Sequence, residues 1–192
     1  MTSRKNGFSL IEVLVSVFVL TVGVIGAAGM QLTALHTAQQ SAFQTRALHL
    51  ASNMADMMRA NVEQMRLDDS VNPYLRVDYA ASSTTTHASE YQCYDADRYC
   101  DAAQLARFDI SELQRHVDTG LPGGRVRICR DVSPWNATTG RFEWDCALPS
   151  HSTSAPLVIK IGWQEKNSAG KPMQNSTSFA PGMVLTVTPY PK

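Results

Sequence analysis

Residues 7–30 have the sequence GFSLIEVLVSVFVLTVGVIGAAGM, an apolar run near the start of a chain of 192 residues. Residues 7–47 contain only two charged side chains, Glu12 and Arg46. The uncharged part, Val13–Met30, is 18 residues long, close to the minimum of about 17–20 residues for a membrane-spanning helix. We therefore predict one transmembrane helix in this part of the chain.

A short basic leader, Met1–Gly7, precedes the apolar run. An ordinary secretory signal is cut after its apolar stretch, but here the helical pattern continues through the candidate site at residues 27–29. A carboxylate inside a membrane span costs roughly 2.5–3.5 kcal/mol, so Glu12 needs a partner. Cleavage between Gly7 and Phe8 would supply one, because it creates a positive amine four residues before Glu12.

This N-terminus resembles the class III signal of type IV prepilins. The resemblance rests on the basic leader, on Gly7 and Phe8, on Glu12 at the fifth mature position, and on the apolar helix. It implies that a prepilin peptidase cuts after Gly7 and methylates Phe8. It also implies that Glu12 pairs with the N-terminal amine of a neighbouring subunit during assembly. The competing interpretation is a plain signal anchor with a chance glutamate.

One position departs from the family pattern. Major pilins usually carry a proline at mature position 22, which in this chain is Gly29. Gly23, Gly26 and Gly29 follow one another at three-residue spacing. Each weakens a helix by about 0.8–1.0 kcal/mol relative to alanine, and small residues also allow close helix packing. The sequence leaves both interpretations of the glycines open.

Helical periodicity continues beyond the span. The apolar residues that recur at steps of three or four are Phe43, Ala47, Leu50, Met54, Met58, Val62 and Met65. No proline interrupts residues 8–65, so we predict one continuous helix, roughly 85–90 Å long at 1.5 Å per residue. Its second half should pack on a globular head, with the methionines filling the core.

The rest of the chain predicts one more helix and a sheet. Residues 68–92 have loop composition, and a helix is expected from Asp101, as N-cap, to Thr119. The four expected strands are Arg125–Arg130, Arg141–Trp144, Leu157–Trp163 and Met183–Thr188. In the third strand apolar residues alternate with Val158, Lys160 and Gly162, which predicts one buried and one solvated face.

These elements predict an α+β protein with the type IV pilin fold, in which the long N-terminal helix packs on a four-stranded antiparallel sheet. The predicted parts are a leader (1–7), the membrane-spanning and assembly half of the helix (8–30), its amphipathic half (31–66), a connecting region with the second helix (67–124), and the sheet with a C-terminal tail (125–192).

Four cysteines, Cys93, Cys100, Cys129 and Cys146, predict disulfides, because an even number in an exported chain is typical of an oxidising compartment. The alternative, a metal site, needs clustered ligands, and the sequence has no CxxC and only scattered histidines. Of three possible connectivities we favour Cys93–Cys100 and Cys129–Cys146.

The second pair raises a difficulty of register. If Cys129 and Cys146 lie directly opposite each other on paired strands, two apolar pairs fall on opposite faces of the sheet, Val126 and Ile128 on one and Phe142 and Trp144 on the other. Alternation argues that all four should be buried together. A one-residue bulge near residue 131 or 145 would restore agreement.

Catalytic and nucleic-acid-binding functions find no support in the sequence. No nucleophile elbow, Walker loop or HExxH motif is present, so we expect no enzyme activity and no cofactor or metal. Positive and negative side chains balance at 17 each, so no overall charge points toward nucleic acid.

A second resemblance narrows the family. The segment Leu121-Pro122-Gly123-Gly124 between helix and strand, the strand Val158–Trp163 and the opening residues 12–15 resemble the PilV group of type IV minor pilins. This resemblance implies a low-abundance subunit that primes pilus assembly or forms the tip complex, and that supports adhesion and twitching motility. The alternatives are a minor pseudopilin of a type II secretion system and a single-span membrane-anchored binding module.

The same resemblance implies partners and location. The expected partners are the prepilin peptidase, other minor pilins, the major pilin, an inner-membrane assembly platform and a tip adhesin. The expected location is the inner membrane, with one span and a periplasmic C-terminal domain, and afterwards the pilus or cell surface.

Overall fold

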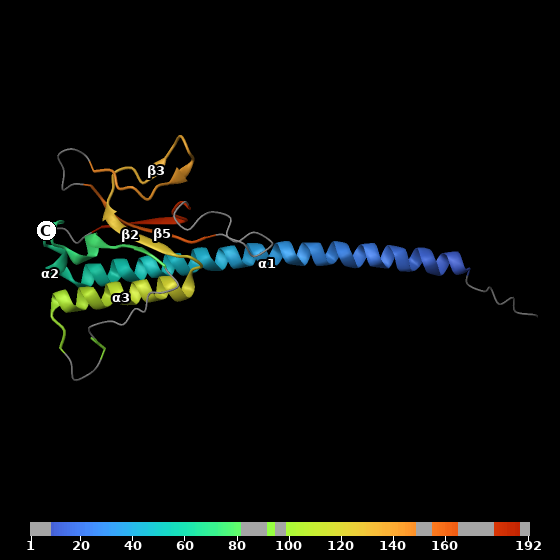
Figure 1. Cartoon of the computed structure of the whole chain (residues 1–192), viewed down its shortest axis with the longest axis horizontal. Helices are drawn as coiled ribbons and strands as arrows, with labels where there is room; N and C mark the ends of the chain where they lie inside the picture. Colours follow the sequence, from blue (N-terminus) through green and yellow to red (C-terminus); the bar gives the residue numbers. More distant parts are fainter. Residues whose placement is uncertain (1–8, 82–91, 95–98, 149–154, 165–178, 189–192) are drawn as a thin grey trace, which may run out of the picture. The chain divides into compact units, whose positions relative to one another are not determined.

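The computed structural model describes residues 9–81, 92–94, 99–148, 155–164 and 179–188 (Figure 1). The chain forms two compact units, Met1–Ala42 and Phe43–Lys192. Helix α1 (Leu10–Ala60) supplies residues 10–42 of the first unit and continues into the second, which we call the head.

Helix α1 is shorter than the sequence predicts, because the helical path breaks at Asn61. The backbone of Asn61 has φ −90° and ψ 64°, and its side chain accepts a hydrogen bond from the backbone N–H of Gln64. Its Nδ2 donates to the backbone carbonyl of Ala102, at 2.8 Å. These contacts start a separate short helix, α2 (Val62–Met65), so the prediction of one unbroken helix to residue 65 was wrong.

The head contains a four-stranded antiparallel sheet in the order β1-β2-β5-β6. Its strands are β1 (Asp78–Ala80), β2 (Arg125–Arg130), β5 (Leu157–Gly162) and β6 (Met183–Val187). This confirms the α+β fold with a long helix on a four-stranded antiparallel sheet. One strand of the sheet differs from the prediction, because β1 comes from the segment that we expected to be a loop. The remaining elements of the head are η1 (Pro73–Arg76) and α3 (Ala102–Gly120).

The expected strand at residues 141–144 does not join this sheet. Strand β4 (Arg141–Phe142) pairs only with β3 (Trp135–Asn136), in a separate two-stranded sheet. It cannot pair with β2, because β1 and β5 occupy both edges of that strand. The register difficulty at Cys129 and Cys146 therefore disappears without a bulge: their disulfide links a strand of the main sheet to a segment outside it.

Helix α3 begins and packs as the sequence predicts. The Asp101 side chain accepts from the N–H of Gln104 at 2.7 Å, and the Gln104 side chain accepts from the N–H of Asp101 at 3.0 Å. This capping box confirms Asp101 as the N-cap. Arg46 near one end of the head part of α1 donates to the carbonyl of Gly120, at 3.0 Å. Because Asn61 contacts Ala102 at the other end, α1 and α3 run antiparallel in the head (Figure 1).

The core of the head lies between these two helices and one face of the sheet. From α1 it takes Ala47, Ala51, Met54, Ala55 and Met58, all at most 1% exposed. From α3 it takes Ala106, Leu113 and Val117, and from the sheet chiefly Val126, Ile128, Ile159 and Ile161. The predicted core role of Met54 and Met58 is confirmed.

The opposite face of the sheet is not solvated as predicted. Lys160 on β5 is completely buried, and its Nζ donates to Asp131 Oδ2 at 2.5 Å. The same ammonium donates to the backbone carbonyls of Glu143 and Asp145, at 2.7 and 2.6 Å. Residues 131–147, which we call the outer segment, therefore cover this face with the β3–β4 hairpin at their centre (Figure 1).

Asp131 and Trp144 complete the attachment of the outer segment. Oδ1 of Asp131 accepts from the N–H groups of Ser133 and Ala147, at 2.9 and 3.2 Å. The Trp144 indole donates to the carbonyl of Phe179 at 2.5 Å and lies so close to Gly162 that a Cβ there would approach it to 2.9 Å. The lysine and Trp144 thus hold a two-stranded sheet that would be marginal by itself.

Replacing Lys160 by methionine tests this attachment. The variant leaves the buried Asp131 carboxylate without its cation, so the free energy of unfolding should fall by about 3–5 kcal/mol. The measurement is denaturant unfolding of the full chain in detergent micelles.

Arg127→Met is the matched control. Arg127 lies directly opposite Lys160 on β2, but its side chain is 29% exposed and its ion pair with Asp78 spans 3.6 Å. We expect this substitution to cost about 0–1 kcal/mol. Similar losses in the two variants would show that the buried ion pair does not hold the outer segment.

Candidate functional site

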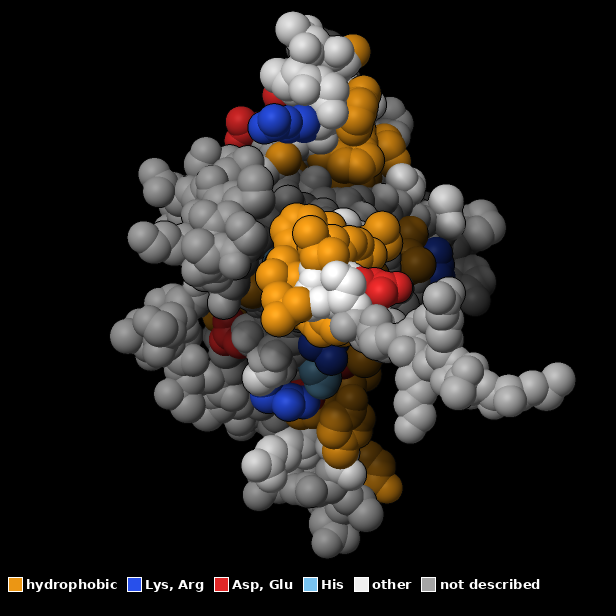
Figure 2. Space-filling model, turned by 90° about the vertical axis from the view of Figure 1, so that its right-hand side faces the viewer, with side chains coloured by type: hydrophobic (Ala, Val, Ile, Leu, Met, Phe, Trp, Pro, Cys, Tyr) orange, Lys and Arg blue, Asp and Glu red, His pale blue; other side chains and the backbone are white. Residues whose placement is uncertain are grey.

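The first unit presents an apolar surface. The large hydrophobic side chains of residues 10–35 are all more than half exposed, from Val13 at 52% to Leu10 at 82%. Figure 2 looks toward the N-terminal end of α1 and shows hydrophobic side chains gathered around the helix. Surfaces of this kind mark membrane or protein contacts, because soluble monomers rarely expose contiguous apolar patches above a few hundred Å². Among the described residues α1 is the one helix long and apolar enough, by length and composition, to cross a membrane.

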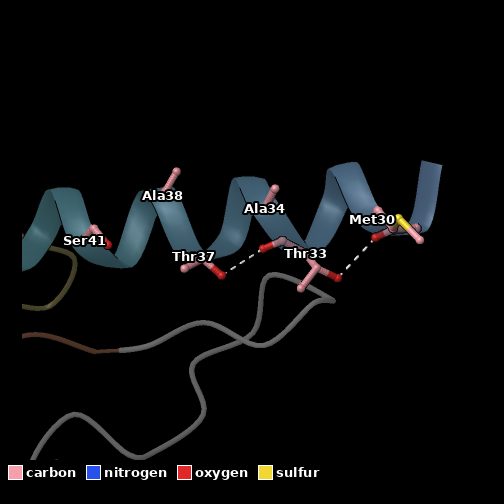
Figure 3. Close-up of a pocket in the computed structure, with 7 residues that line it drawn as sticks. Met30, Thr33, Ala34, Thr37, Ala38 and Ser41 are labelled. Carbon is pink, nitrogen blue, oxygen red and sulfur yellow. Dashed lines mark hydrogen bonds between the residues drawn. The ribbon is translucent and has the colours of Figure 1, made fainter. Parts of the chain in front are cut away.

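The hydroxyl groups on this part of α1 are satisfied within the helix itself. Ser16 and Thr21 donate to the carbonyls of Glu12 and Phe18, each at 2.7 Å. Thr33 and Thr37 donate to carbonyls one turn earlier, each at 3.1 Å (Figure 3). Polar groups in a bilayer must find partners inside the protein, and these side chains do so without a neighbouring helix.

Glu12 is the one charged side chain on this surface. It is exposed in the first turn of α1, and the carbonyl of Ser9 accepts from the N–H groups of Glu12 and Val13, at 3.0 and 3.4 Å. A carboxylate there is favoured by the helix dipole by about 0.3–1 kcal/mol. Residues 9–45 contain no lysine or arginine, so a cation for Glu12 must come from the chain before Ser9 or from another molecule. Gly7 and Phe8, the predicted cleavage site, lie outside the described residues.

Two shallow grooves follow the helix surface. One is lined by Leu10, Val13, Leu14, Val17, Phe18 and Thr21. The other is lined by mostly small residues, Gly29, Met30, Thr33, Ala34, Thr37, Ala38 and Ser41, and Figure 3 shows Ala34 and Ala38 pointing away from Thr33 and Thr37. Added Cβ atoms at Gly23, Gly26 and Gly29 would meet nothing within 4 Å, and α1 is continuous through them. The glycines therefore form open, flat sites on a regular helix, where another backbone can approach closely.

The four cysteines form the two favoured pairs, Cys93–Cys100 with an S–S distance of 2.02 Å and Cys129–Cys146 with 1.98 Å. Within the described part of the chain no three His, Cys, Asp or Glu side chains gather as metal ligands. The predicted site residues therefore lie in separate places, Glu12 on the apolar helix and the disulfides in the head.

Sequence reasoning missed two buried polar groups of the head. One is the Lys160–Asp131 ion pair, and the other is a cluster of Asn61, Tyr74 and Asp109 at the end of α1. Their partners lie 29 residues apart in the first case and up to 48 in the second, so no local pattern reveals them.

Comparison with known families gives two matches. Residues 29–111 match the family of the type IV pilin Tt1218, and residues 2–28 match the prokaryotic N-terminal methylation motif. The second match contains Gly7, Phe8 and Glu12. No curated protein and no solved structure matches the chain.

A charge in the middle of the apolar surface tests its role as a membrane anchor. Leu20→Arg places an arginine at the centre of the run, where insertion costs about 2.5–3.5 kcal/mol, so the membrane-bound share after alkaline extraction should fall strongly. Gln39→Arg, on the exposed helix beyond the run, should leave that share unchanged. An unchanged share for Leu20→Arg would contradict a membrane-embedded helix.

Proposed function

Because the chain belongs to the type IV pilin family and carries its N-terminal methylation motif, we propose that it is a minor pilin that primes pilus assembly or forms the pilus tip complex. In this role it supports pilus-dependent adhesion and twitching motility. The observation that carries the proposal is an apolar helix surface with a single carboxylate, Glu12, in its first turn.

Maturation prepares this helix for assembly. We propose that prepilin peptidase removes residues 1–7 and methylates Phe8, which leaves a positive amine near the start of α1. The Glu12 carboxylate of one subunit then pairs with the amine of a neighbour, so that one contact compensates two charges in an apolar environment. Glu12 lacks any lysine or arginine within residues 9–45, which supports a partner at the N-terminus of a second subunit.

Two observations favour a minor pilin over a major one. Gly29 stands where major pilins usually have proline, and α1 is regular there. The two head segments that resemble the PilV group are also neighbours, since Gln164, directly after Trp163, donates to the carbonyl of Pro122 at 2.8 Å. Gly123 has φ +54° in this turn, which favours glycine, and a Cβ at Gly124 would come within 2.7 Å of Val117.

The basic leader and the disulfides support the proposed orientation. Arg4 and Lys5 precede the apolar run, and basic residues favour the cytoplasmic side of a membrane. The head carries Cys93–Cys100 and Cys129–Cys146 on the other side of the run, as expected for a periplasmic domain. The proposed partners are accordingly the assembly platform in the inner membrane, other minor pilins, the major pilin and a tip adhesin.

Glu12→Ala tests the assembly role. The variant should enter the membrane and be cleaved normally, because it removes a charge from the span, but its share in the sheared pilus fraction should fall at least about tenfold if the pair supplies about 1.4 kcal/mol or more. The measurement is quantitative immunoblotting of sheared pili and membranes from cells that carry wild type or variant.

Ser16→Ala is the control. Ser16 lies one turn after Glu12, and its hydroxyl is already bonded to the Glu12 carbonyl, so its loss should leave pilus incorporation intact. Incorporation of Glu12→Ala at the wild-type level would refute the proposed pair. Wild-type protein found with a secretion apparatus, and absent from sheared pili, would instead assign the chain to the minor pseudopilins.

A further inference from the structure

Three buried polar side chains meet where α1 ends. Asn61, Tyr74 and Asp109 are 6%, 0% and 5% exposed. The Tyr74 hydroxyl donates to Asp109 Oδ2 at 2.9 Å and accepts from Asn61 Nδ2 at 3.2 Å. The same Nδ2 donates to the carbonyl of Ala102, in the first turn of α3. The cluster therefore joins α1, η1 and α3 through side chains that are nearly closed to water.

The backbone around the cluster depends on the same residues. Asn61 is the N-cap of α2, and the Asn72 side chain accepts from the N–H of Tyr74 at 3.0 Å to start η1. Asn72 is itself 1% exposed. A change in the strength of the Tyr74–Asp109 hydrogen bond should therefore affect the first residues of α2 and η1.

Asp109 is buried, and no lysine or arginine of the described residues forms an ion pair with it. On α3, Arg107 is exposed, and Glu112 pairs with Arg115 at 2.5 Å. On η1, Arg76 bonds the carbonyl of Ser70. On α1, Arg59 pairs with Asp56 at 2.7 Å, and Arg46 donates to the carbonyl of Gly120. Glu63 of α2 is exposed, and the arginines of β2 pair with Asp69, Asp78 and Asp145. In the part of the chain that the structure describes, the neutral Tyr74 hydroxyl donates to the Asp109 carboxyl and in turn accepts from the neutral Asn61 amide.

Burial raises the pKa of Asp109, and the hydrogen bond from Tyr74 only partly opposes this effect. Burial also raises the pKa of the Tyr74 hydroxyl, followed by the charge of Asp109, so the hydroxyl keeps its proton and remains a donor. A carboxyl without a cation in low dielectric is more stable in its neutral form.

We propose that the Asn61–Tyr74–Asp109 cluster is an acid-responsive joint, in which Asp109 takes up a proton at a higher pH than an ordinary aspartate and α3 and η1 are then held more firmly at the end of α1. The proton comes from solvent and adds to the carboxylate, while Oδ2 continues to accept from Tyr74. The joint concerns the head alone and does not depend on the proposed role in pilus assembly.

The direction of the pH effect follows from the folded and unfolded states. The folded protein binds the Asp109 proton more tightly than the unfolded chain, in which an aspartate titrates near about 3.9. The contribution of Asp109 to the free energy of unfolding is therefore complete below about pH 4 and is lost as pH rises through its raised pKa. This is opposite to a salt-bridged aspartate, which stabilises the folded state at higher pH.

Asp109→Asn tests the joint in the full chain in detergent micelles. The amide can still accept from Tyr74 but stays neutral at every pH. The unfolding equilibrium constant of wild type, divided by that of the variant, should fall as the pH is lowered from about 7.5 to about 4.5. Protection of the amides of α2 and η1 from hydrogen exchange should likewise increase toward acidic pH in wild type relative to the variant.

Asp118→Asn is the matched control. Asp118 also lies on α3 and accepts from a tyrosine, Tyr79, at 2.7 and 2.9 Å, but it is only partly buried. The free energy of unfolding of this variant should rise toward acidic pH as that of wild type does. A ratio for Asp109→Asn that is flat or rises toward acid would overturn the proposal.

Direct titration of the wild-type chain covers the case in which Asp109→Asn fails to fold. The side-chain carboxyl signal of Asp109 in ¹³C-labelled protein should shift at a pH above the ordinary aspartate range. A midpoint at or below about 3.9 would overturn the proposal whatever the variants do.

Discussion

The small side chains that α1 buries in the head determine how closely the sheet and α3 can approach this helix. The buried residues recur every three or four positions along the helix and form one stripe. The stripe consists of Ala47, Ala51, Met54, Ala55 and Met58. Alanine lets neighbouring backbones come near, and methionine adapts to the irregular gaps that remain. Arg46 and Asn61 then fix the two ends of α3 through backbone carbonyls. A larger residue in this stripe would separate both layers at once, since overpacking costs about 1–3 kcal/mol.

The same helix serves two surroundings. Up to Leu35 its large apolar side chains are exposed, and its hydroxyls are satisfied internally, whereas from Ala47 onward one face is buried in protein. The first part suits lipid or the helices of other subunits, and its single carboxylate, Glu12, suits a partner that brings a positive charge. In the head, the Lys160–Asp131 ion pair and the Cys129–Cys146 disulfide hold the outer segment. The division is consistent with a helix that is anchored in a membrane before assembly, as we propose for this chain.

Local sequence patterns predicted what local physics determines. The apolar run, the N-cap at Asp101 and the strands β2 and β5 follow from periodicity and capping, and the structure has them. The break at Asn61 was not predictable in this way, because it depends on a hydrogen bond to Ala102, far along the chain. The sequence also placed Lys160 on a solvated face. Alternation shows which residues share a face of a strand, but only the tertiary structure shows that Asp131 lies over the face that carries Lys160. Strand β1, three residues long, is too short to leave a periodic signal.

The N-terminal residue of the mature protein tests most directly whether the chain is processed as a pilin subunit. Intact-mass and peptide mass spectrometry of the protein purified from membranes would identify its first residue and any added methyl group. A chain that begins at Phe8 with a methylated amine is the result expected for a processed pilin subunit. A chain that keeps Met1 and the basic leader would contradict it, because Glu12 would then lack the amine with which we propose that it pairs.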